Sequence, residues 1–231
     1  MRALLWCGVV GPVVFVAGFL VLGATRRDYS PVRHSVSSLQ LGEWGWLQTA
    51  NFVLAGLLTV AFAVGLRFAL RRYGAGIWAP LIVGLVGVGL VGAGVFATDP
   101  ISGYPPGTPL DPPPTLEGTL HNAFSTPVFL GLPIACCIVA YRFGKHGHRR
   151  WVCYSLATAV VFLLGFIAAC LAFAQQPIFA PYGGLFQRAT IMIGLAWVFA
   201  LAVATSRTGG RGRRRGRRRW CAGATGRAGA R

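Results

Sequence analysis

Acidic residues are almost missing from this chain of 231 residues, which has 5 Asp and Glu against 22 Lys and Arg. Charged residues of both signs make up only 12% of the sequence, whereas 55% of it is hydrophobic. A soluble globular domain carries roughly 25% charged residues, and a disordered chain is poor in apolar ones. The composition therefore excludes a soluble enzyme and a disordered protein, and it indicates a membrane protein.

Two common metal-binding spacings are also missing, because the sequence has neither a Cys-x-x-Cys pair nor a His-x-x-x-His pair. Zinc sites often use these spacings, so we predict no metal site and no cofactor. Five of the six cysteines lie in or beside apolar stretches, and the sixth, Cys221, lies near the C-terminus. This placement predicts small apolar packing residues and not a disulfide framework.

Six uncharged apolar stretches are present, each long enough to cross roughly 30 Å of hydrocarbon as a helix. They are Ala3–Ala24, Trp44–Leu66, Ile77–Thr98, Leu120–Tyr141, Trp151–Ala174 and Ala189–Ser206. The predicted fold class is an all-α membrane protein, a bundle of six transmembrane helices over residues 1–206. Residues 207–231 are predicted to form a disordered, Arg-rich cytoplasmic tail.

The distribution of charge predicts the orientation of these spans. If the N-terminus is cytoplasmic, 18 basic residues lie inside and only 4 outside, and all five acidic residues lie outside. We therefore predict a multi-pass protein of the bacterial cytoplasmic membrane with both termini in the cytoplasm.

A short motif recurs where the second, fourth and sixth spans begin. The segments starting at Gly45, Gly118 and Gly184 all fit G-x-[LF]-[QH]-x-A. The third and fifth spans both end in F-A-x-x-P-I. Chance matches between apolar helices are one explanation, and three repeated helix hairpins are the other. A repeat would place Gln48, His121 and Gln187 at equivalent positions around an outer opening.

The first outer loop contains Ser30-Pro31, a typical helix start. Val32, Val36 and Leu39 would then share one face, which predicts a short amphipathic helix on the outer surface. Ser35 and Ser38 lie beside that face and are ordinarily solvated or capping residues, although each could also bind a ligand or act as a nucleophile.

The second outer loop, 99–119, carries seven prolines and is predicted to cover the outer mouth. Thr115 is the expected N-cap of the fourth helix, with Glu117 in its first turn. Five glycines between positions 84 and 94 make the third span thin, which predicts close packing and a central place in the bundle.

Asp99, His121 and Arg188 are predicted at similar depth at the outer ends of three spans. Three interpretations remain open. The first is a structural Asp99–Arg188 ion pair with His121 as a neighbour. The second is a binding site for a lipid headgroup or a small polar ligand, with Arg188 as the anion anchor. The third is catalysis, with His121 as a general base oriented by Asp99 or Glu117.

Several polar side chains are candidates for the same site as ligand-binding residues. They are Arg188, Gln48, Asn51, Gln187, Asn122, Ser35 and Ser38. Asn51 also has an ordinary explanation as an interhelical hydrogen bond. The leading functional hypothesis is a protein that binds a lipid headgroup or small ligand, or supports envelope processes. The alternatives are a membrane-embedded lipid hydrolase or transferase and a small transporter; the last is disfavoured because no span has an ionisable residue at its middle.

The predicted partners are the bilayer itself and, for the tail, anionic lipids of the inner leaflet, at about 1 kcal/mol per basic residue near the surface. Nucleic acid is a weaker explanation of the same Arg-Gly composition. The sequence leaves the oligomeric state open.

The order of several motifs resembles domain of unknown function family 998. The segments that carry the resemblance are 29–39, 46–52, 96–100, 118–122 and Gln187-Arg188, within about residues 3–206. The resemblance implies a six-span integral membrane protein of prokaryotes. It implies no activity, and it does not include the Arg-rich tail.

Overall fold

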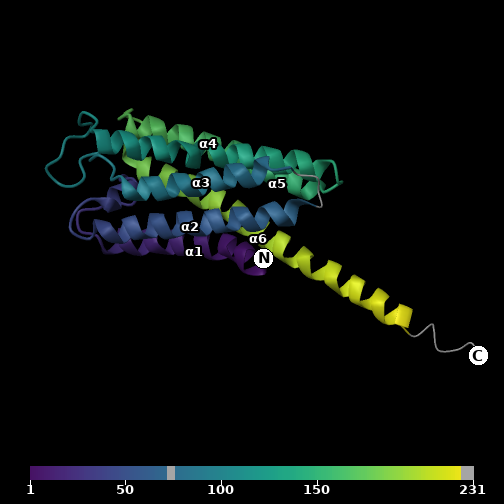
Figure 1. Ribbon diagram of the computed structural model, residues 1–231. Helices are drawn as coiled ribbons and strands as arrows, with labels where there is room; N and C mark the ends of the chain where they lie inside the picture. The colour runs from purple at the N-terminus through teal and green to yellow at the C-terminus, as the bar shows by residue number, and fades with distance from the viewer. Residues whose placement is uncertain (72–75, 225–231) are drawn as a thin grey trace, which may run out of the picture.

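Six long helices make up the structure, a computed structural model that describes residues 1–71 and 76–224, with side chains as far as Arg207 (Figure 1). The helices are α1 Arg2–Thr25, α2 Gly45–Leu70, α3 Trp78–Val95, α4 Leu116–Gly144, α5 Arg149–Phe173 and α6 Gly183–Ala224. All six are long and apolar enough to cross a membrane. The predicted six-helix bundle is confirmed, and the chain is a multi-pass membrane protein.

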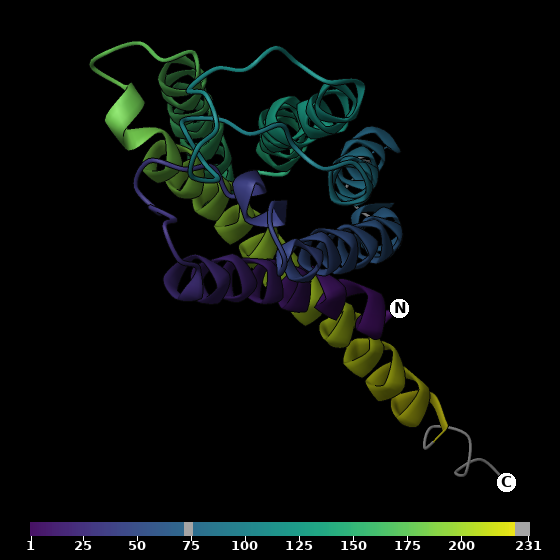
Figure 2. The same cartoon turned by 90° about the vertical axis from the view of Figure 1, so that its left-hand side faces the viewer.

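The helices form a closed ring in chain order. Each helix packs against the next one, and α6 packs back against α1 (Figure 2). The buried apolar residues form two clusters along the ring axis, one around Trp197 and Phe162 and the other around Phe15 and Leu39. α6 crosses the ring obliquely (Figure 2), so the space nearer the start of α6 must be filled by side chains or left as a cavity.

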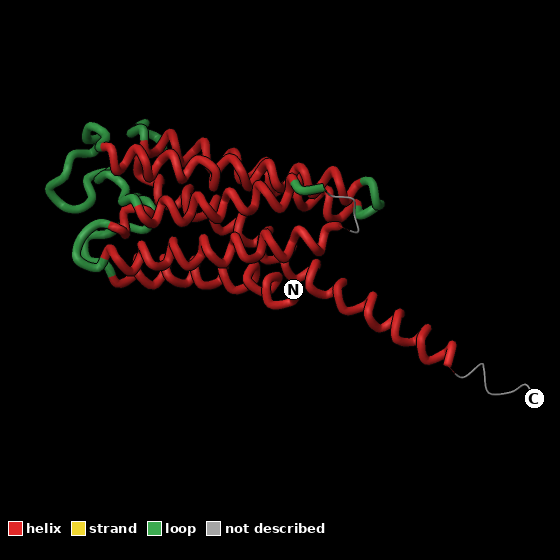
Figure 3. The backbone as a smooth tube through the Cα atoms, in the orientation of Figure 1, coloured by secondary structure: helices red, strands yellow, loops and turns green. Residues whose placement is uncertain are grey.

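The two ends of the ring differ. The connections 26–44, 96–115 and 174–182 lie at one end, which we name the loop end, and the N-terminus lies towards the other (Figure 3). Two 3-10 turns lie within these connections, η1 at Ser37–Gln40 and η3 at Ala180–Tyr182. The loop end therefore holds most of the irregular backbone, whose polar groups need partners that a helix would otherwise supply.

Helix bounds differ from the predicted spans at two informative places. α3 stops at Val95, because Phe96 takes an extended conformation. α6 begins at Gly183, before the predicted start at Ala189, and so includes Arg188. A charged residue ends a hydropathy-based span, but this helix continues because the guanidinium is buried against partners in the protein.

The Arg-rich tail gives a different result from the one predicted. The backbone of α6 continues as helix to Ala224, so a tail that is disordered from residue 207 onward is not confirmed. Residues 225–231 lie outside the described residues, and the tail's lipid contacts stay a prediction.

The glycines of α3 face its neighbours closely, as the sequence predicts. A Cβ on Gly87 would lie 2.8 Å from the carbonyl oxygen of Gly56 in α2, and one on Gly89 would lie 2.5 Å from that of Phe124 in α4. The predicted central place of α3 is wrong, because α3 is one of six helices in a ring. Its glycines permit close approach on two sides instead.

Candidate functional site at the loop end

The connection 26–44 closes the loop end of the ring, and we name it the plug. Its η1 turn lies inside the outline of the six helices (Figure 2). Val36 and Leu39 are fully buried in the core, while Val32 is 44% exposed. The predicted surface helix is therefore wrong: Val36 and Leu39 bury more apolar area inside the ring than they could on a membrane surface.

Arg188 of α6 holds the plug in place. Its Nη1 donates hydrogen bonds to the carbonyl oxygens of Pro31 and His34 in the plug, and to that of Gly184. Its Nη2 donates to the hydroxyl of Tyr29. The side chain is only 6% exposed. Because the side chain is buried and its Nη1 and Nη2 atoms already donate to the protein, Arg188 is poorly placed to bind an external anion.

Three aromatic rings pack above this guanidinium. The ring centroids of Tyr29, His34 and Tyr104 lie 5.0 to 5.5 Å apart, so the proline-rich connection contributes Tyr104 to the plug's cover. Burial raises the pKa of Tyr29 to about 12, and nearby Arg188 only partly offsets this. Burial, followed by the charges of Arg33 and Arg188, lowers the pKa of His34. His34 is thus neutral, and its Nδ1 accepts a hydrogen bond from the Ser30 backbone N–H at 3.0 Å.

The two candidate carboxylates stabilise the start of α4. Asp99 accepts hydrogen bonds from both the backbone N–H and the hydroxyl of Thr115, the confirmed N-cap, whose oxygen in turn accepts from Gly118 N–H at 3.1 Å. Glu117 accepts from Ala97 N–H at 3.0 Å. The expected Asp99–Arg188 ion pair is absent from the described residues, because each partner is held by groups of its own neighbourhood.

His121 is 2% exposed and joins three segments. Its Nδ1 lies 2.9 Å from the Phe96 carbonyl oxygen, and its Nε2 lies 3.1 Å from Ser37 Oγ in the plug. Neither Asp99 nor Glu117 bonds to the imidazole. The interpretation in which a carboxylate orients His121 as a general base is therefore wrong. The extended Phe96, the first residue after α3, supplies the orienting oxygen.

The two glutamines of the recurring motif have different surroundings. Gln48 is fully buried and accepts from Asn51 Nδ2 at 3.3 Å, while Asn51 also donates to the Phe15 carbonyl of α1. This is the interhelical hydrogen bond predicted for Asn51. Gln187 instead accepts from Val36 N–H of the plug at 2.7 Å. His121 and Gln187 thus both hold the plug, whereas Gln48 and Asn51 connect α2 to α1.

The motif's glycines have a shared physical reason. A Cβ at Gly45, Gly118 or Gly184 would collide with the Gln40 carbonyl, the Asp99 carboxylate, or the Pro31 and His34 carbonyls respectively. Each glycine lets a loop-end segment cross directly over the start of an even-numbered helix. The predicted placement of Gln48, His121 and Gln187 around one outer opening is not confirmed, because Gln48 bonds to Asn51 while the other two bond to the plug, and the repeat itself stays a prediction.

A pocket of about 390 Å³ opens beside the plug between α4, α5 and α6. Its polar wall comes from the plug, the connection after α3 and the first three turns of α4, with one residue from α6. It comprises Ser35, Ser37, Thr98, His121, Asn122, Ser125, Thr126 and Gln187. Its apolar wall includes Phe129, Phe166 and Phe173. Asn122, Thr126 and Cys170 are exposed on the facing sides of α4 and α5. The pocket therefore opens sideways between two membrane helices.

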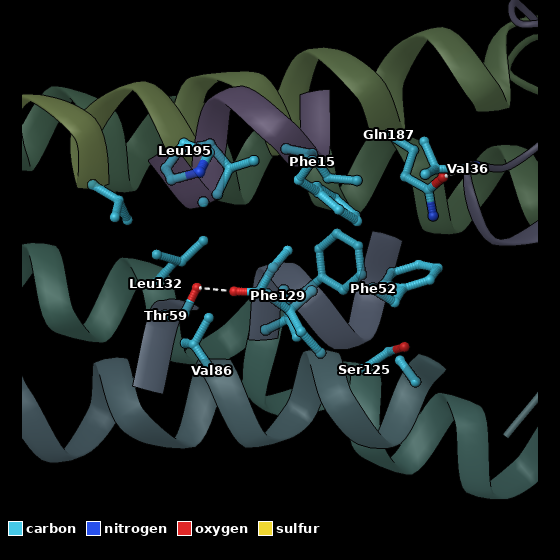
Figure 4. A pocket seen from close by; sticks show the side chains of 18 of the residues that line it. Phe15, Val36, Phe52, Thr59, Val86, Ser125, Phe129, Leu132, Gln187 and Leu195 are labelled. Atoms are coloured by element: carbon cyan, nitrogen blue, oxygen red, sulfur yellow. Dashed lines mark hydrogen bonds between the residues drawn. The ribbon is translucent and has the colours of Figure 1, made fainter. Parts of the chain in front are cut away.

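A narrow apolar cavity of about 40 Å³ lies next to this pocket, inside the ring. Ser37, Ser125, Phe129 and Gln187 line both spaces. Figure 4 shows Phe15 and Phe52 beside the cavity, with Val36 and Gln187 at one end. The cavity is too small for a hydrocarbon chain, so the pocket between α4, α5 and α6 is the space that could hold a ligand.

The pocket brings together only part of the predicted set. Ser35, Asn122, His121 and Gln187 line it, whereas Gln48, Asn51, Ser38 and Arg188 do not. Ser35 Oγ and Ser38 Oγ share a hydrogen bond of 2.8 Å, and Ser35 Oγ also accepts from Ser38 N–H, so this pair stabilises the turn.

Ser37 and Ser125 line the pocket although no sequence pattern indicated them. An α-helical spacing placed Ser35 and Ser38 beside the apolar face and passed over Ser37. The 3-10 geometry of η1, which the sequence did not indicate, instead points Ser37 at His121. Through Arg207, apart from residues 72–75, no cluster of three His, Cys, Asp or Glu side chains could hold a metal ion.

The family model described as "Protein of unknown function (DUF998)" matches residues 9–204 of the chain, nearly all of the helical ring. No curated protein and no solved structure matches the chain.

Proposed function

Because the chain belongs to the DUF998 family, whose description names no activity, we propose from its geometry that it binds a neutral amphipathic lipid at the loop end. The polar part of this lipid lies against the plug, and its hydrocarbon part lies between α4 and α5. The observation that carries the proposal is the sideways-opening pocket with one polar and one apolar wall.

The absence of charge on the pocket wall selects the class of ligand. None of the residues lining the pocket is Asp, Glu, Lys or Arg. A phosphate or carboxylate headgroup would need a cation or several N–H donors, and Arg188 is buried beneath the plug and does not line the pocket. Hydroxyl, amide and imidazole groups are instead suited to an ester or hydroxyl headgroup. Acylglycerols and fatty esters have this chemistry.

The position of the pocket also supports the proposal. It lies at the end of the membrane-spanning region, where a lipid headgroup would meet the protein, and its side opening faces the hydrocarbon. On the charge distribution of the sequence, we place this end at the outer face of a bacterial cytoplasmic membrane, with both termini inside. The helical tail then meets the anionic inner leaflet. An envelope process involving neutral lipids is the corresponding cellular role.

Mass spectrometry of lipids that copurify in mild detergent tests the binding. The wild-type protein should retain a neutral lipid close to one per chain, and Thr126→Trp should lose it by filling the side opening. Ala123→Trp is the matched control, because Ala123 is exposed on the same helix but does not line the pocket. Equal lipid content in the two variants, or none in the wild type, would overturn the proposal.

A further inference from the structure

Ser37 and His121 have the geometry of a nucleophile and its base. Ser37 Oγ lies 3.1 Å from His121 Nε2, and His121 Nδ1 lies 2.9 Å from the Phe96 carbonyl oxygen. A carbonyl can only accept, so the imidazole proton must reside on Nδ1. Nε2 is then a free acceptor, and the Ser37 hydroxyl donates to it. In serine hydrolases the nucleophile and base share this arrangement, with a third group orienting the imidazole.

The plug positions Ser37 firmly. Val36, the preceding residue, is held by Gln187 through its N–H and is fully buried. The Tyr29 hydroxyl donates to the Ser35 carbonyl at 2.7 Å, and Arg188 holds the His34 carbonyl. A serine at the start of such a restrained turn loses little entropy when it reaches a reactive geometry.

Among the serines of the plug, Ser37 both faces the pocket and bonds to the imidazole of His121. It is partly exposed and lines both the pocket and the axial cavity, whereas Ser38 is fully buried. The Ser35 hydroxyl is engaged with Ser38. A purely structural His–Ser contact would be expected to face packed side chains, but this contact faces open space.

Side-chain amides on the same pocket wall could stabilise an oxyanion. The Gln187 carbonyl oxygen is fixed by Val36 N–H, which leaves its Nε2 without a hydrogen-bond partner among the described residues. Figure 4 shows the amide nitrogen of Gln187 turned away from Val36. Asn122, next to His121, contributes a second amide to the pocket. Donors of this kind stabilise the negative charge that develops when a carbonyl is attacked.

We propose that Ser37 and His121 form a nucleophile–base pair that hydrolyses the ester bond of a neutral lipid held in this pocket. Ser37 Oγ attacks the ester carbonyl carbon while its proton moves to His121 Nε2. The carbon–oxygen bond to the alcohol then breaks, and the imidazolium returns that proton to the leaving alkoxide, so an acyl-Ser37 ester remains. Water, deprotonated by His121 Nε2, attacks the carbonyl carbon of this ester. The bond between that carbon and Ser37 Oγ breaks, the fatty acid leaves, and the imidazolium returns the proton to Ser37 Oγ. The inference rests on the proposed lipid binding for its substrate class.

An alkyl fluorophosphonate tests the nucleophile. The purified full-length protein in nanodiscs is incubated with dodecyl fluorophosphonate, and the modified residue is located by peptide mass spectrometry. We expect Ser37 to carry the phosphonate, with fluoride released. His121→Gln should slow labelling by roughly 100-fold or more, the contribution typical of a general base. His146→Gln, on the exposed turn after α4, is the matched control and should label like the wild type.

A second variant keeps the test decisive if His121→Gln misfolds. In Ser37→Cys, the neighbouring imidazole should generate a thiolate, so chloroacetamide should alkylate Cys at position 37 at least about tenfold faster than the cysteine of Thr126→Cys, an exposed site on the same pocket wall whose hydroxyl bonds to the Asn122 carbonyl. Equal alkylation rates, or a wild-type Ser37 that resists the fluorophosphonate, would overturn the nucleophile–base pair. The lipid content of the same wild-type sample separates the two proposals: lipid with an unreactive Ser37 rejects hydrolysis alone, and a reactive Ser37 without lipid rejects lipid binding alone.

Discussion

The guanidinium of Arg188 and the main-chain carbonyl of His34 are joined by a hydrogen bond of 2.9 Å, although the two residues are 154 positions apart in the chain. This bond attaches the first connection of the ring to its last helix. Arg188, which the sequence made a candidate anchor for an anionic ligand, therefore acts as a structural clamp on the plug.

Replacing Arg188 should therefore affect stability more than ligand specificity. Arg188→Met would remove the guanidinium donor from the carbonyls of Pro31 and His34 and leave the latter with only the longer bond from the Tyr29 hydroxyl, and losing a donor at a buried carbonyl costs about 1–3 kcal/mol. We expect a clear loss of thermal stability in detergent. Arg33→Met is the control, because Arg33 is exposed on the same plug. A destabilisation no larger than that of the control would contradict the clamp.

Asp99 should be energetically coupled to Thr115 and not to Arg188. Asp99→Ala and Thr115→Ala each remove part of the same cap, which is typically worth about 1 kcal/mol, so their effects on the free energy of unfolding should be less than additive. Asp99→Ala and Arg188→Met should be additive. A double-mutant cycle measures both couplings, and a large coupling between Asp99 and Arg188 would restore the ion pair expected from the sequence.

Stability should fall in mild acid because of His34. Burial and the nearby Arg33 and Arg188 lower the pKa of His34 in the folded state, so below the ordinary value of about 6.5 the unfolded state binds the proton more readily. Protonation of Nδ1 would also break its bond from Ser30 N–H. Tyr29 and Tyr104, which pack on the same ring, have raised pKa values and stay neutral in this range.

The comparison of the wild type with His34→Gln isolates this contribution. The wild type should lose more of its thermal stability between pH 7.5 and pH 5 than His34→Gln does. Parallel losses in the two proteins would assign the acid sensitivity to other groups.

Substitution by alanine should have opposite effects on stability at two glycines of α3. At Gly87 the new Cβ would meet backbone of α2 at 2.8 Å, so Gly87→Ala should destabilise the α2–α3 contact by about 1–3 kcal/mol. At Gly84 the nearest atom is the Cβ of Ala63 at 3.7 Å, an ordinary contact. Gly84→Ala should be neutral or stabilising, by up to about 1 kcal/mol. Thermal melts of the two variants check the pair, and equal effects would mean that helix spacing is not set by Gly87.

The predicted orientation can be checked with an impermeant maleimide on intact cells. In a cysteine-free background, Asp111→Cys on the proline-rich connection should be labelled from outside, and His146→Cys at the opposite end should be labelled only after lysis. The reverse pattern would invert the orientation predicted by the charges.

Much of the fold was predictable because it depends on local composition. A run of about 20 uncharged apolar residues must be helical in hydrocarbon, so the number of helices needed no tertiary information. The Thr115 cap was also predictable, because an N-cap is made by residues close in sequence. Hydropathy failed at the start of α6, where a buried Arg188 continues the helix.

The site was only partly predictable, because its contacts join distant segments. Glu117 and His121 are four residues apart on α4, so their pairing was a reasonable expectation. The structure pairs His121 instead with Ser37, 84 residues away, and with Phe96. Neither contact leaves a periodic signal in the sequence.

The sequence by itself determined the membrane class, the six helices, the glycine-rich contacts of α3 and the concentration of polar residues at one end, since these follow from hydrophobicity, chain length and side-chain size. Only the tertiary structure decided that the first connection turns inward as a plug, and that Arg188 donates its hydrogen bonds to this plug. Apolar burial of Val36 and Leu39 outweighs a place on the membrane surface, and the buried carbonyls then require a donor. Both the apolar burial and the hydrogen-bond donor are available only when all six helices surround the plug, so local sequence does not reveal them.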